Sequence, residues 1–352
     1  MSGSSLDGLD IAHVQLDEVR GKWTYQLLHT ACIPYANNWL HSLQQAANMQ
    51  VGEFLKLNTD YGRYLGEKVN EFIAENGIEH QVHFIASHGH TVFHEPEHRT
   101  TFQLGDGAAL AATTKLPVIS DLRSLDVALG GQGAPIVPIG DKMLFSDYDY
   151  LLNIGGIANI TVYEHGNPVA FDICPANQIM NNLASRVGKL MDENGAMAAS
   201  GKLLPGLLDE LNEALYYRLL PPKSLSNEAA QDIIFPKLSQ SEHSVADMLH
   251  TMCVHIAQQV AAAVRQSPHG KEMASLVATG GGAFNGFLVE QLRQELSPLN
   301  VTVVVPDAEV VKYKEALVMA LIGTLRWREE TNVLSSVTGA VKDSCGGALW
   351  LG

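Results

Sequence analysis

Three glycine-containing turns are the segments of this sequence best suited to hold an anion. They cover residues 2–8, 153–159 and 279–285. Glycine lets the main chain approach a ligand closely, and clustered N–H groups bind phosphate oxygens. Hairpins also use glycine, so one turn indicates little, but three favour a phosphorylated ligand. The candidate ATP- or phosphate-binding residues are Ser2, Gly3, Ser4, Ser5, Asp7, Gly8, Gly155, Gly156, Asn159, Gly280, Gly281, Gly282 and Asn285.

Two aspartates are candidates for acid–base or metal chemistry. Asp172 ends an apolar strand pattern shortly before Pro175, a residue typical of the first turn of a helix. Its carboxylate can act as a general base or simply cap that helix. Asp7 lies in the first glycine turn, where it can organise Mg²⁺ and phosphate or close an Asx-turn. The residues alone leave both pairs of alternatives open.

Three histidines, His88, His90 and His94, lie in one polar loop. They resemble a metal cluster, but hydrogen bonding to a hydroxylated ligand is the interpretation that the loop favours. They are therefore candidate substrate-binding residues.

Gln103 and Arg123 lie in segments that are unusually polar for their apolar surroundings, and they are candidates for the same ligand. Arg123 can hold a ligand carboxylate in a two-pronged contact, or it can pair with Asp121 or Asp126. Neither reading is preferred by the sequence.

The elements that must position these residues form an α/β pattern in two halves. Strand patterns cover 9–16 and 23–30, and a helical pattern covers 52–76. A second hairpin pattern, over 150–163, surrounds Gly155 and Gly156, and a helix is predicted over 175–193. Because both halves open with a glycine-turn hairpin, we expect a duplicated domain with a cleft between the copies.

The predicted domains cover residues 1–130 and 131–352, with a helical insertion at about 204–266 in the second. The first glycine turn directly follows Met1, although such a turn normally joins two strands. The first domain is therefore expected to lack its first strand, unless the turn is only a frayed terminus.

Composition excludes several classes of protein. The chain has 352 residues, 23 Lys and Arg against 38 Asp and Glu, and a net charge of −15, so its field repels nucleic acid and anionic membranes. Four separated cysteines argue against a disulfide framework or a zinc site, and no apolar run approaches the length of a membrane span. We expect a cytoplasmic enzyme without nucleic-acid or membrane partners.

Ten segments, in order along the chain, resemble the anhydro-N-acetylmuramic acid kinase family of the actin/hexokinase/Hsp70-like ATPase superfamily. They are SGSSLDGLD (2–10), SHGHT (87–91), FQLGDGAAL (102–110), SDLRSLD (120–126), GGQGAP (130–135), LNIGGIANIT (152–161), FDICPAN (171–177), GAMAASG (195–201), ATGGGAFN (278–285) and EALVMALIG (315–323). The resemblance runs almost from end to end.

This resemblance implies two ribonuclease-H-like (actin-like ATPase) domains with ATP and Mg²⁺ in an interdomain cleft. It implies an enzyme that opens the 1,6-anhydro ring of a small cell-wall sugar, 1,6-anhydro-N-acetylmuramic acid, and phosphorylates O6 during peptidoglycan recycling. Asp172 matches the family's general base, Glu315 a sugar-contacting acid, and Asn177 belongs to the same motif as Asp172. The resemblance also allows a homodimer.

Some positions depart from the family pattern. Cys174 and Ala176 stand where glycine is usual, His90 replaces a usual glutamine, and Asn194 a usual aspartate. A Cβ would be costly at either glycine position if the backbone there needed a positive φ. Two alternatives therefore remain: a kinase for another anhydro sugar such as levoglucosan or for a simple hexose, and a catalytically weak paralogue that binds nucleotide.

Overall fold

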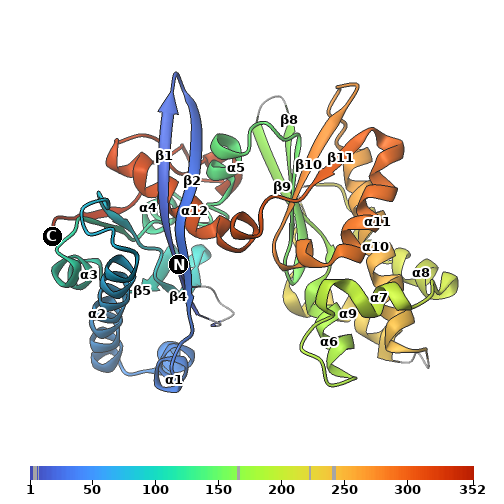
Figure 1. The fold of residues 1–352 in the computed structure, drawn as a ribbon, viewed down its shortest axis with the longest axis horizontal. Coiled ribbons are helices and arrows are strands. Elements are labelled where there is room, and N and C mark those ends of the chain that lie inside the picture. The colour runs from blue at the N-terminus through green and yellow to red at the C-terminus, as the bar shows by residue number, and fades with distance from the viewer. Residues whose placement is uncertain (3–5, 7, 165–166, 222, 240–242) are drawn as a thin grey trace. The chain divides into compact units, whose positions relative to one another are not determined.

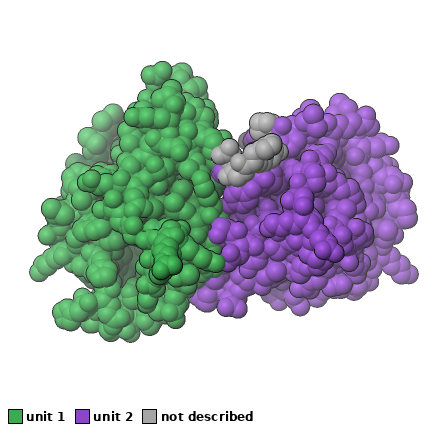
Figure 2. Space-filling view, turned by 90° about the horizontal axis from the view of Figure 1, so that it is seen from above, with its two compact units in different colours: residues 1–144, 313–352 green, residues 145–312 purple. Residues whose placement is uncertain are grey.

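The computed structural model describes residues 1–352 except residues 3–5, 7, 165–166, 222 and 240–242. The chain divides into two units, which Figure 2 shows in different colours. Unit 1 consists of residues 1–144 and 313–352, and unit 2 of residues 145–312. The α/β fold class is confirmed.

Unit 2 is built on a five-stranded sheet in the order β11-β10-β7-β8-β9. β8 pairs antiparallel with β7 and β9, whereas β10 pairs parallel with β7 and β11. β9, β8 and β7 thus form an antiparallel meander, which β10 and β11 extend as parallel strands. The strands are β7 (Tyr150–Ile154), β8 (Ile157–Glu164), β9 (Asn167–Pro175), β10 (Ala274–Thr279) and β11 (Val301–Val304).

Helices bury the apolar side chains of this sheet. The largest contribution comes from α10, which begins at the capping residue Ser244 and carries buried side chains along most of its length. The central strand β7 is almost entirely buried, as a strand covered on both faces must be. The helices of unit 2 are α6 (Asn177–Ser185), η3 (Glu193–Gly195), α7 (Ala196–Ser200), α8 (Pro205–Asn212), η4 (Leu215–Arg218), α9 (Asn227–Ser239), α10 (Val245–Gln266), η5 (Gly281–Phe284), α11 (Gly286–Leu296) and η6 (Ser297–Leu299).

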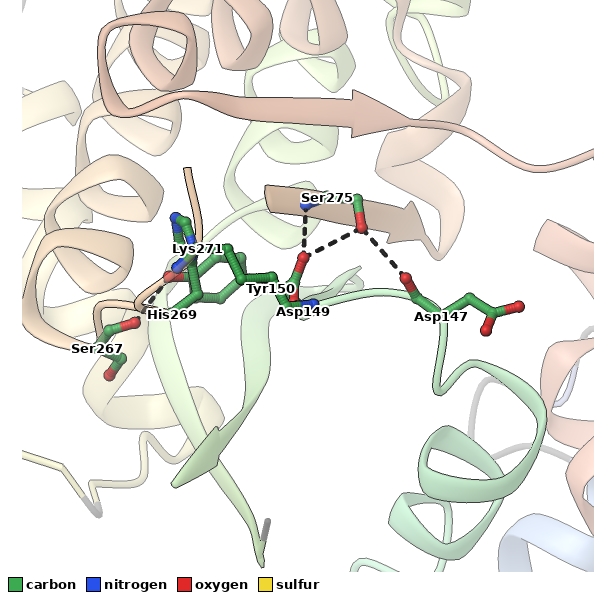
Figure 3. A network of polar contacts seen from close by, with 7 residues as sticks. All are labelled: Asp147, Asp149, Tyr150, Ser267, His269, Lys271 and Ser275. Atoms are coloured by element: carbon green, nitrogen blue, oxygen red, sulfur yellow. Dashed lines mark hydrogen bonds and ion pairs between the residues drawn. The ribbon is translucent and has the colours of Figure 1, made fainter. Parts of the chain in front are cut away.

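A polar network joins β7 and β10 where these two strands begin (Figure 3). The Asp149 carboxylate accepts from the Ser275 N–H over 2.9 Å and pairs with Lys271. Burial raises the pKa of Asp149, but the bonds from Lys271 and Ser275 outweigh it and leave that pKa below its usual value. Tyr150 Oη donates to the Ser267 carbonyl over 2.7 Å. These bonds satisfy the polar groups where β7 and β10 begin. The glycine turns lie at the other end of the same two strands.

The described strands of unit 1 belong to three small sheets. Two are antiparallel hairpins, β1-β2 and β4-β5, and the third has the order β12-β6-β3. β3 and β6 are parallel, and β12 pairs antiparallel with β6. The strands are β1 (Leu9–Val19), β2 (Lys22–Ile33), β3 (Ile85–Ala86), β4 (His90–Glu95), β5 (Thr100–Leu104), β6 (Val118–Ser120) and β12 (Ala348–Trp350).

The long helix of unit 1 confirms the periodicity seen in the sequence. α2 runs from Val51 to Asn76 and ends at Gly77, whose φ of 63° forms the left-handed cap that glycine adopts without strain. The other helices of this unit are α1 (Asn37–Gln45), η1 (Ala46–Asn48), η2 (Pro96–His98), α3 (Gly107–Thr114), α4 (Ser124–Ala128), α5 (Pro138–Leu144) and α13 (Ser335–Thr338).

The division into units differs from the predicted boundary at residues 130/131. The final segment 313–352 belongs to unit 1 because α12 (Ala308–Trp327) contributes apolar side chains such as Leu321 and Leu325 to a core with Ile119 and Ile139. Contacts between segments so far apart in the chain leave no local pattern that could have predicted them.

The helix predicted over residues 175–193 is also shorter than expected. β9 continues through Pro175, and α6 covers only Asn177–Ser185. Pro175 therefore ends a strand instead of opening the helix. The part of the predicted range that follows Ser185 is rich in turns, and Gly188 in it has a φ of 73°.

Candidate functional site

Two of the three predicted glycine turns lie at the same edge of the unit 2 sheet. β7 and β10 are parallel neighbours, with Thr279 opposite Asn153. Gly155 and Gly156 follow the end of β7, and Gly280–Gly282 follow the end of β10. Because the carboxyl ends of parallel strands meet at one edge of a sheet, the two turns become neighbours there. Ligands of α/β sheets bind at such an edge.

Asn177 joins these two turns through its side chain. Its Nδ2 donates to the Ile154 carbonyl over 2.9 Å, and its N–H donates to the Gly155 carbonyl over 3.0 Å. A Cβ built on Gly281 would lie 3.3 Å from Asn177 Nδ2, so the third turn passes directly beside this amide. The sequence placed Asn177 in the substrate site; the structure shows it hydrogen-bonded to the main chain of the turn after β7 and adjacent to the turn after β10.

Gly280 is a position that no other residue fills easily. Its φ is +79°, and an added Cβ would lie 2.5 Å from Asn153 Oδ1 and 2.8 Å from the Ile154 carbonyl oxygen. The positive φ turns the chain sharply out of β10, and the close approach keeps the two turns together. Glycine at position 280 is thus required by the backbone of unit 2 itself.

Two exposed glycines and one unpartnered side-chain amide mark this edge of the sheet in the described chain. Gly156 and Gly281 are exposed. Within the described residues, the buried Gln178 Nε2 has no hydrogen-bond partner, and its Cβ lies 3.7 Å from a Cβ built on Gly156. A buried amide donor without a partner costs about 1–3 kcal/mol, which a bound acceptor would recover. Phosphate oxygens are acceptors of this kind.

Asn285 has a structural role in the described fold. Its Oδ1 accepts from the Leu288 N–H over 2.9 Å and so caps α11. Asn159 lies on β8 opposite Asp172 on β9, just beyond a register shift that leaves Ile173 without a partner. Such β-bulges re-aim side chains and are common beside active sites. The structure thus brings Asn159 and Asp172 together, whereas Asn285 is committed to its helix.

Asp172 is held by main chain from a distant loop. Its Oδ2 accepts from the Leu225 N–H over 2.8 Å and from Ser224 Oγ over 3.3 Å. Burial raises the pKa of Asp172, and these two hydrogen bonds oppose the shift. Its Oδ1 receives no hydrogen bond from the part of the chain that the structure describes. One carboxylate oxygen is anchored and the other can accept a proton, the arrangement that a general base needs.

The helix-capping alternative for Asp172 is wrong. The residue at the start of α6 is Ala176, and that helix has no side-chain cap. Asp172 lies further back, inside β9, because the strand extends beyond the point that the sequence suggested.

Neither residue that replaces a family glycine adopts the left-handed backbone conformation. Ala176 has a φ of −135°, and Cys174 pairs with Ala158 inside β9. Neither has a positive φ. Cys174 is completely buried, and burial raises the pKa of its thiol far above its usual value. The two departures therefore introduce no left-handed strain into the segment that carries Asp172.

In unit 1, the described part of the first glycine turn contacts the histidine loop. Ser2 is buried, and its Oγ lies 3.2 Å from His90 Nδ1. A Cβ on Gly8 would lie 2.8 Å from Cys32 Sγ, so the end of this turn packs tightly against β2. The predicted phosphate-binding residues Gly3, Ser4, Ser5 and Asp7 lie outside the described residues.

Arg123 is bound to His88, not to an aspartate. Its Nε donates to His88 Nε2 over 2.9 Å, and its Nη1 donates to the Gly133 carbonyl over 2.6 Å. Across the described residues no ion pair links Arg123 to Asp121 or Asp126, so the pairing that the sequence left open is wrong. Asp126 instead accepts from the Gly133 N–H over 2.8 Å.

Both ring nitrogens of His88 are occupied. Because Nε2 accepts from Arg123, the proton of the neutral ring lies on Nδ1, which faces the Gly89 carbonyl at 3.1 Å. Burial and the Arg123 charge lower the pKa of His88 to about 3. His88 therefore orients the guanidinium as a neutral acceptor and has no lone pair left for a metal. In the described chain, no group of three His, Cys, Asp or Glu side chains has the geometry of a metal site.

Glu315, near the start of the unit 1 part of α12, interacts electrostatically with Arg123. The Glu315 side chain reaches solvent, while the protein packed around it raises its pKa and Arg123 opposes that shift. Burial in turn lowers the pKa of Arg123, and Glu315 opposes that effect. Unit 1 thus presents a carboxylate and a guanidinium of opposite charge within one neighbourhood.

His94 and Gln103 meet at a threonine on the β4-β5 hairpin. Thr101 Oγ1 lies 3.1 Å from His94 Nδ1 and 2.8 Å from Gln103 Nε2. Gln103 Oε1 is buried without a partner among the described residues, which leaves an acceptor for a hydroxyl. A Cβ on Gly133 would lie 3.4 Å from His94 Cε1, so this hairpin is adjacent to the Arg123 contact with Gly133.

The sequence did not single out every polar residue of these regions. Asn153 and Gln178 flank the glycine turns, and Ser224 and Leu225 hold Asp172. Asn153 stands inside the LNIGG motif and could have been noticed. Ser224 and Leu225 could not, because they reach Asp172 from a distant segment of the chain, Ser224 through its hydroxyl and Leu225 through its N–H.

Comparison with known proteins identifies one family along the whole chain. A family model described as "Anhydro-N-acetylmuramic acid kinase" matches residues 1–352. Anhydro-N-acetylmuramic acid kinases from Bacillus cereus and Bacillus thuringiensis are each 31% identical over 97% of this chain, covering 95% and 94% of those proteins. A glucokinase structure from Streptomyces griseus aligns with 84% of this chain and with 94% of the glucokinase chain. The two sequences are 9% identical in this alignment, and the TM-score is 0.35. Within the described residues, no helix is both long and apolar enough to cross a bilayer.

Proposed function

The chain belongs to the anhydro-N-acetylmuramic acid kinase family, and we propose how its described residues carry out that family's reaction. The protein is a sugar kinase that uses ATP to open the 1,6-anhydro ring of 1,6-anhydro-N-acetylmuramic acid and to phosphorylate O6, which gives N-acetylmuramic acid 6-phosphate. The family match over residues 1–352 carries this assignment and does not support the alternative substrates. The proposal that follows concerns the roles of individual residues.

Asp172 is the general base. In an anhydro sugar, O6 is an ether oxygen without a proton, so an ordinary kinase base would have nothing to remove. Asp172 takes a proton from water, and that water attacks C1 as in an inverting glycosidase. The C1–O6 bond breaks, and O6 bonds to the γ-phosphorus of ATP in place of being protonated. The bond from that phosphorus to the β,γ-bridging oxygen breaks, and ADP leaves. Support for this role comes from the raised pKa of Asp172 and from its anchored Oδ2.

The glycine turns of unit 2 hold phosphate groups of ATP. Gly156 and Gly281 are exposed, and the unpartnered Gln178 amide beside Gly156 supplies a side-chain donor among the described residues. Neutral donors of this kind suit a chain with a net charge of −15, in which acidic side chains outnumber Lys and Arg. Bound Mg²⁺ would neutralise charge on the phosphates, with Asp7 as its candidate ligand.

The polar cluster of unit 1 binds the sugar. Arg123 is positioned by His88 and the Gly133 carbonyl, so that its remaining donors can meet the lactyl carboxylate of the substrate. Gln103 Oε1 accepts from a sugar hydroxyl, and Glu315 accepts from another. ATP is a cytoplasmic substrate, so we place the reaction in the cytoplasm; a homodimer is part of the same proposal.

Mass analysis in ¹⁸O-water tests the coupled reaction. Purified protein is incubated with ATP, Mg²⁺ and 1,6-anhydro-N-acetylmuramic acid in labelled water. The expected product carries ¹⁸O at C1 and phosphate on O6. Phosphate transfer without label at C1 would contradict water attack at that carbon, and ADP formation without a sugar phosphate would show a nucleotide hydrolase. Levoglucosan and glucose serve as competing acceptors.

A further inference from the structure

One short stretch of unit 2 binds three of the four polar groups of Asp172. The carboxylate Oδ2 accepts from Ser224 and Leu225. The Asp172 N–H donates to the Lys223 carbonyl over 3.0 Å, and the Asp172 carbonyl accepts from Tyr216 Oη over 2.8 Å. The fourth group, Oδ1, receives no hydrogen bond from the described residues. We call Tyr216, Lys223, Ser224 and Leu225 the clamp residues.

The strand that carries Asp172, β9, lies at the edge of the five-stranded sheet. The outer side of an edge strand has main-chain groups that no neighbouring strand binds. The register shift beside Asp172 also leaves Ile173 without a partner on β8, so the sheet is interrupted next to the proposed base. The sheet alone therefore does not fix the direction of the Asp172 carboxylate, and the clamp residues supply contacts that the sheet lacks.

Tyr216 lies in η4 and is itself held firmly. Lys223 Nζ lies 4.6 Å from the centre of the Tyr216 ring and donates to the Tyr216 carbonyl over 3.3 Å. Burial and the nearby Asp172 charge raise the pKa of Tyr216, so its hydroxyl stays protonated and acts as a donor. The Tyr216 hydroxyl therefore has a fixed direction, toward the main chain of Asp172.

The next residue, Tyr217, connects η4 to the core of unit 2. Its Oη lies 3.0 Å from Nε2 of His255, which is completely buried in α10. His255 Nδ1 lies 2.8 Å from Asn212 Oδ1, which can only accept, so the ring proton is on Nδ1 and Nε2 accepts from Tyr217. Two consecutive tyrosines thus connect the buried helices α8 and α10 to Asp172: Tyr217 contacts the helices, and Tyr216 contacts the base.

A general base works only when it is held at the correct place. A misplacement of about 1 Å can lower a rate on the order of 100-fold. Catalytic side chains are therefore held by residues that packing and hydrogen bonds have already fixed. The hydrogen bond from Tyr216 goes to the Asp172 carbonyl and not to its carboxylate, so Tyr216 can affect the reaction only through the position of Asp172.

We propose that Tyr216 is a positioning residue for the reaction, which together with the other clamp residues directs the free Oδ1 of Asp172 at the water that attacks the sugar. The inference rests on the proposed function, because it requires Asp172 to be the general base. Tyr216 lies outside all ten sequence segments that carry the family resemblance, and its contact with Asp172 joins residues 44 positions apart.

Two tyrosine-to-phenylalanine variants of the full chain test this role. Tyr216→Phe removes the hydroxyl but keeps the aromatic ring beside Lys223. Tyr150→Phe is the matched control, because Tyr150 Oη also donates to a main-chain carbonyl, that of Ser267, over 2.7 Å and at the other end of the sheet. The kcat, the KM for 1,6-anhydro-N-acetylmuramic acid, the KM for ATP and the thermal midpoint are measured for both variants and the parent.

Tyr216→Phe is expected to lower kcat by about 10-fold and to leave both KM values within about two-fold. Tyr150→Phe should leave kcat within about two-fold. Each variant loses one hydrogen bond to a carbonyl, so both midpoints should fall by a similar amount, less than about 4 °C. An unchanged kcat in Tyr216→Phe, or an equal loss of kcat in the two variants, would overturn the proposal.

The same substitution in an Asp172→Asn background shows whether Tyr216 acts through the base. If it does, Tyr216→Phe should change the residual kcat of that variant by less than about two-fold. A loss of about 10-fold in both backgrounds would place the effect of Tyr216 elsewhere and contradict the inference. Full turnover in Asp172→Asn alone would refute the general-base assignment and the positioning role with it. An impaired Asp172→Asn beside an unaffected Tyr216→Phe would refute only the positioning role.

Discussion

His88 and Arg123 form one unit in which a neutral histidine accepts from a guanidinium, Nε to Nε2, over 2.9 Å. The Gly133 carbonyl accepts from the same guanidinium over 2.6 Å. Among the described residues, no carboxylate is in direct contact with the Arg123 guanidinium. A cation held in this way is suited to bind an anionic group of a ligand.

Replacing Arg123 by lysine should therefore weaken sugar use. Lysine keeps the charge but cannot donate to His88, to Gly133 and to a ligand at once. We expect kcat/KM for 1,6-anhydro-N-acetylmuramic acid to fall by about 10–100-fold, the scale of one or two lost hydrogen bonds to a charged group. Steady-state kinetics measure this, with the KM for ATP unchanged. Arg186→Lys is the matched control, since Arg186 also donates to a carbonyl, that of Leu238; an equal loss in both variants would argue against the role.

Replacing Asp172 by asparagine removes the base but retains an oxygen that can accept from Leu225. The turnover number should fall by about 10²–10⁴-fold. The thermal midpoint should move by less than about 2 °C, which corresponds to at most about 1.5 kcal/mol in a chain of this size. Single-turnover kinetics and calorimetry check the two effects separately. Asp60→Asn, at an exposed aspartate of α2, is the control. Retained turnover in the Asp172 variant would remove its catalytic assignment.

Gly280→Ala and Gly270→Ala separate backbone strain from steric clash. Both glycines have a positive φ, +79° and +70°, but only the Cβ at Gly280 meets other atoms, among them Asn153 Oδ1 at 2.5 Å. Each alanine costs about 1 kcal/mol for its φ, and Gly280→Ala should cost about 1–3 kcal/mol more. Urea unfolding measures the difference. Because the clash lies between the two glycine turns, ATP affinity should fall only in Gly280→Ala; equal stability losses would contradict the close approach.

Acid should destabilise the protein through its buried histidines. Burial and Arg123 lower the pKa of His88 to about 3, and burial and Lys237 lower that of His255 to about 3. The unfolded chain, in which the pKa of histidine is about 6.5, then binds more protons than the folded one. The contribution of these two histidines to the free energy of unfolding should be constant above about pH 6.5 and fall as the pH decreases toward 3.

His255→Gln should flatten this pH dependence. His255 Nδ1 lies 2.8 Å from Asn212 Oδ1, and Nε2 lies 3.0 Å from Tyr217 Oη, so glutamine can replace both contacts without titrating. Urea unfolding at a series of pH values provides the curve. A variant with the same slope as the parent would show that His255 is not a source of the acid sensitivity.

Restoring the family glycines should not improve the enzyme. Ala176 has a φ of −135°, and Cys174 is a paired strand residue, so neither position relieves a left-handed backbone. The double variant Cys174→Gly with Ala176→Gly is expected to leave kcat within about two-fold and to lower stability by about 1–3 kcal/mol, through greater chain entropy and the loss of a buried thiol. A large rise in kcat would instead identify these departures as harmful to catalysis.

The sequence by itself determined the local features of this protein. The spacing of apolar residues predicted α2, and Gly77 predicted its end, because a helix and its cap depend on residues a few positions apart. The glycine turns after β7 and β10 were likewise visible in the sequence. A backbone with a positive φ, such as that of Gly280, favours glycine at that single position. Motifs in the order of one family indicated the reaction.

Only the tertiary structure decided which distant residues meet. It assigned residues 313–352 to unit 1, joined Arg123 to His88 and placed Ser224 and Leu225 on Asp172. It also showed that Pro175 ends a strand, although proline is typical of a helix start. These contacts form because burial of apolar surface and pairing of backbone groups are satisfied over the whole unit at once, and neither requirement is recorded in the spacing of neighbouring residues.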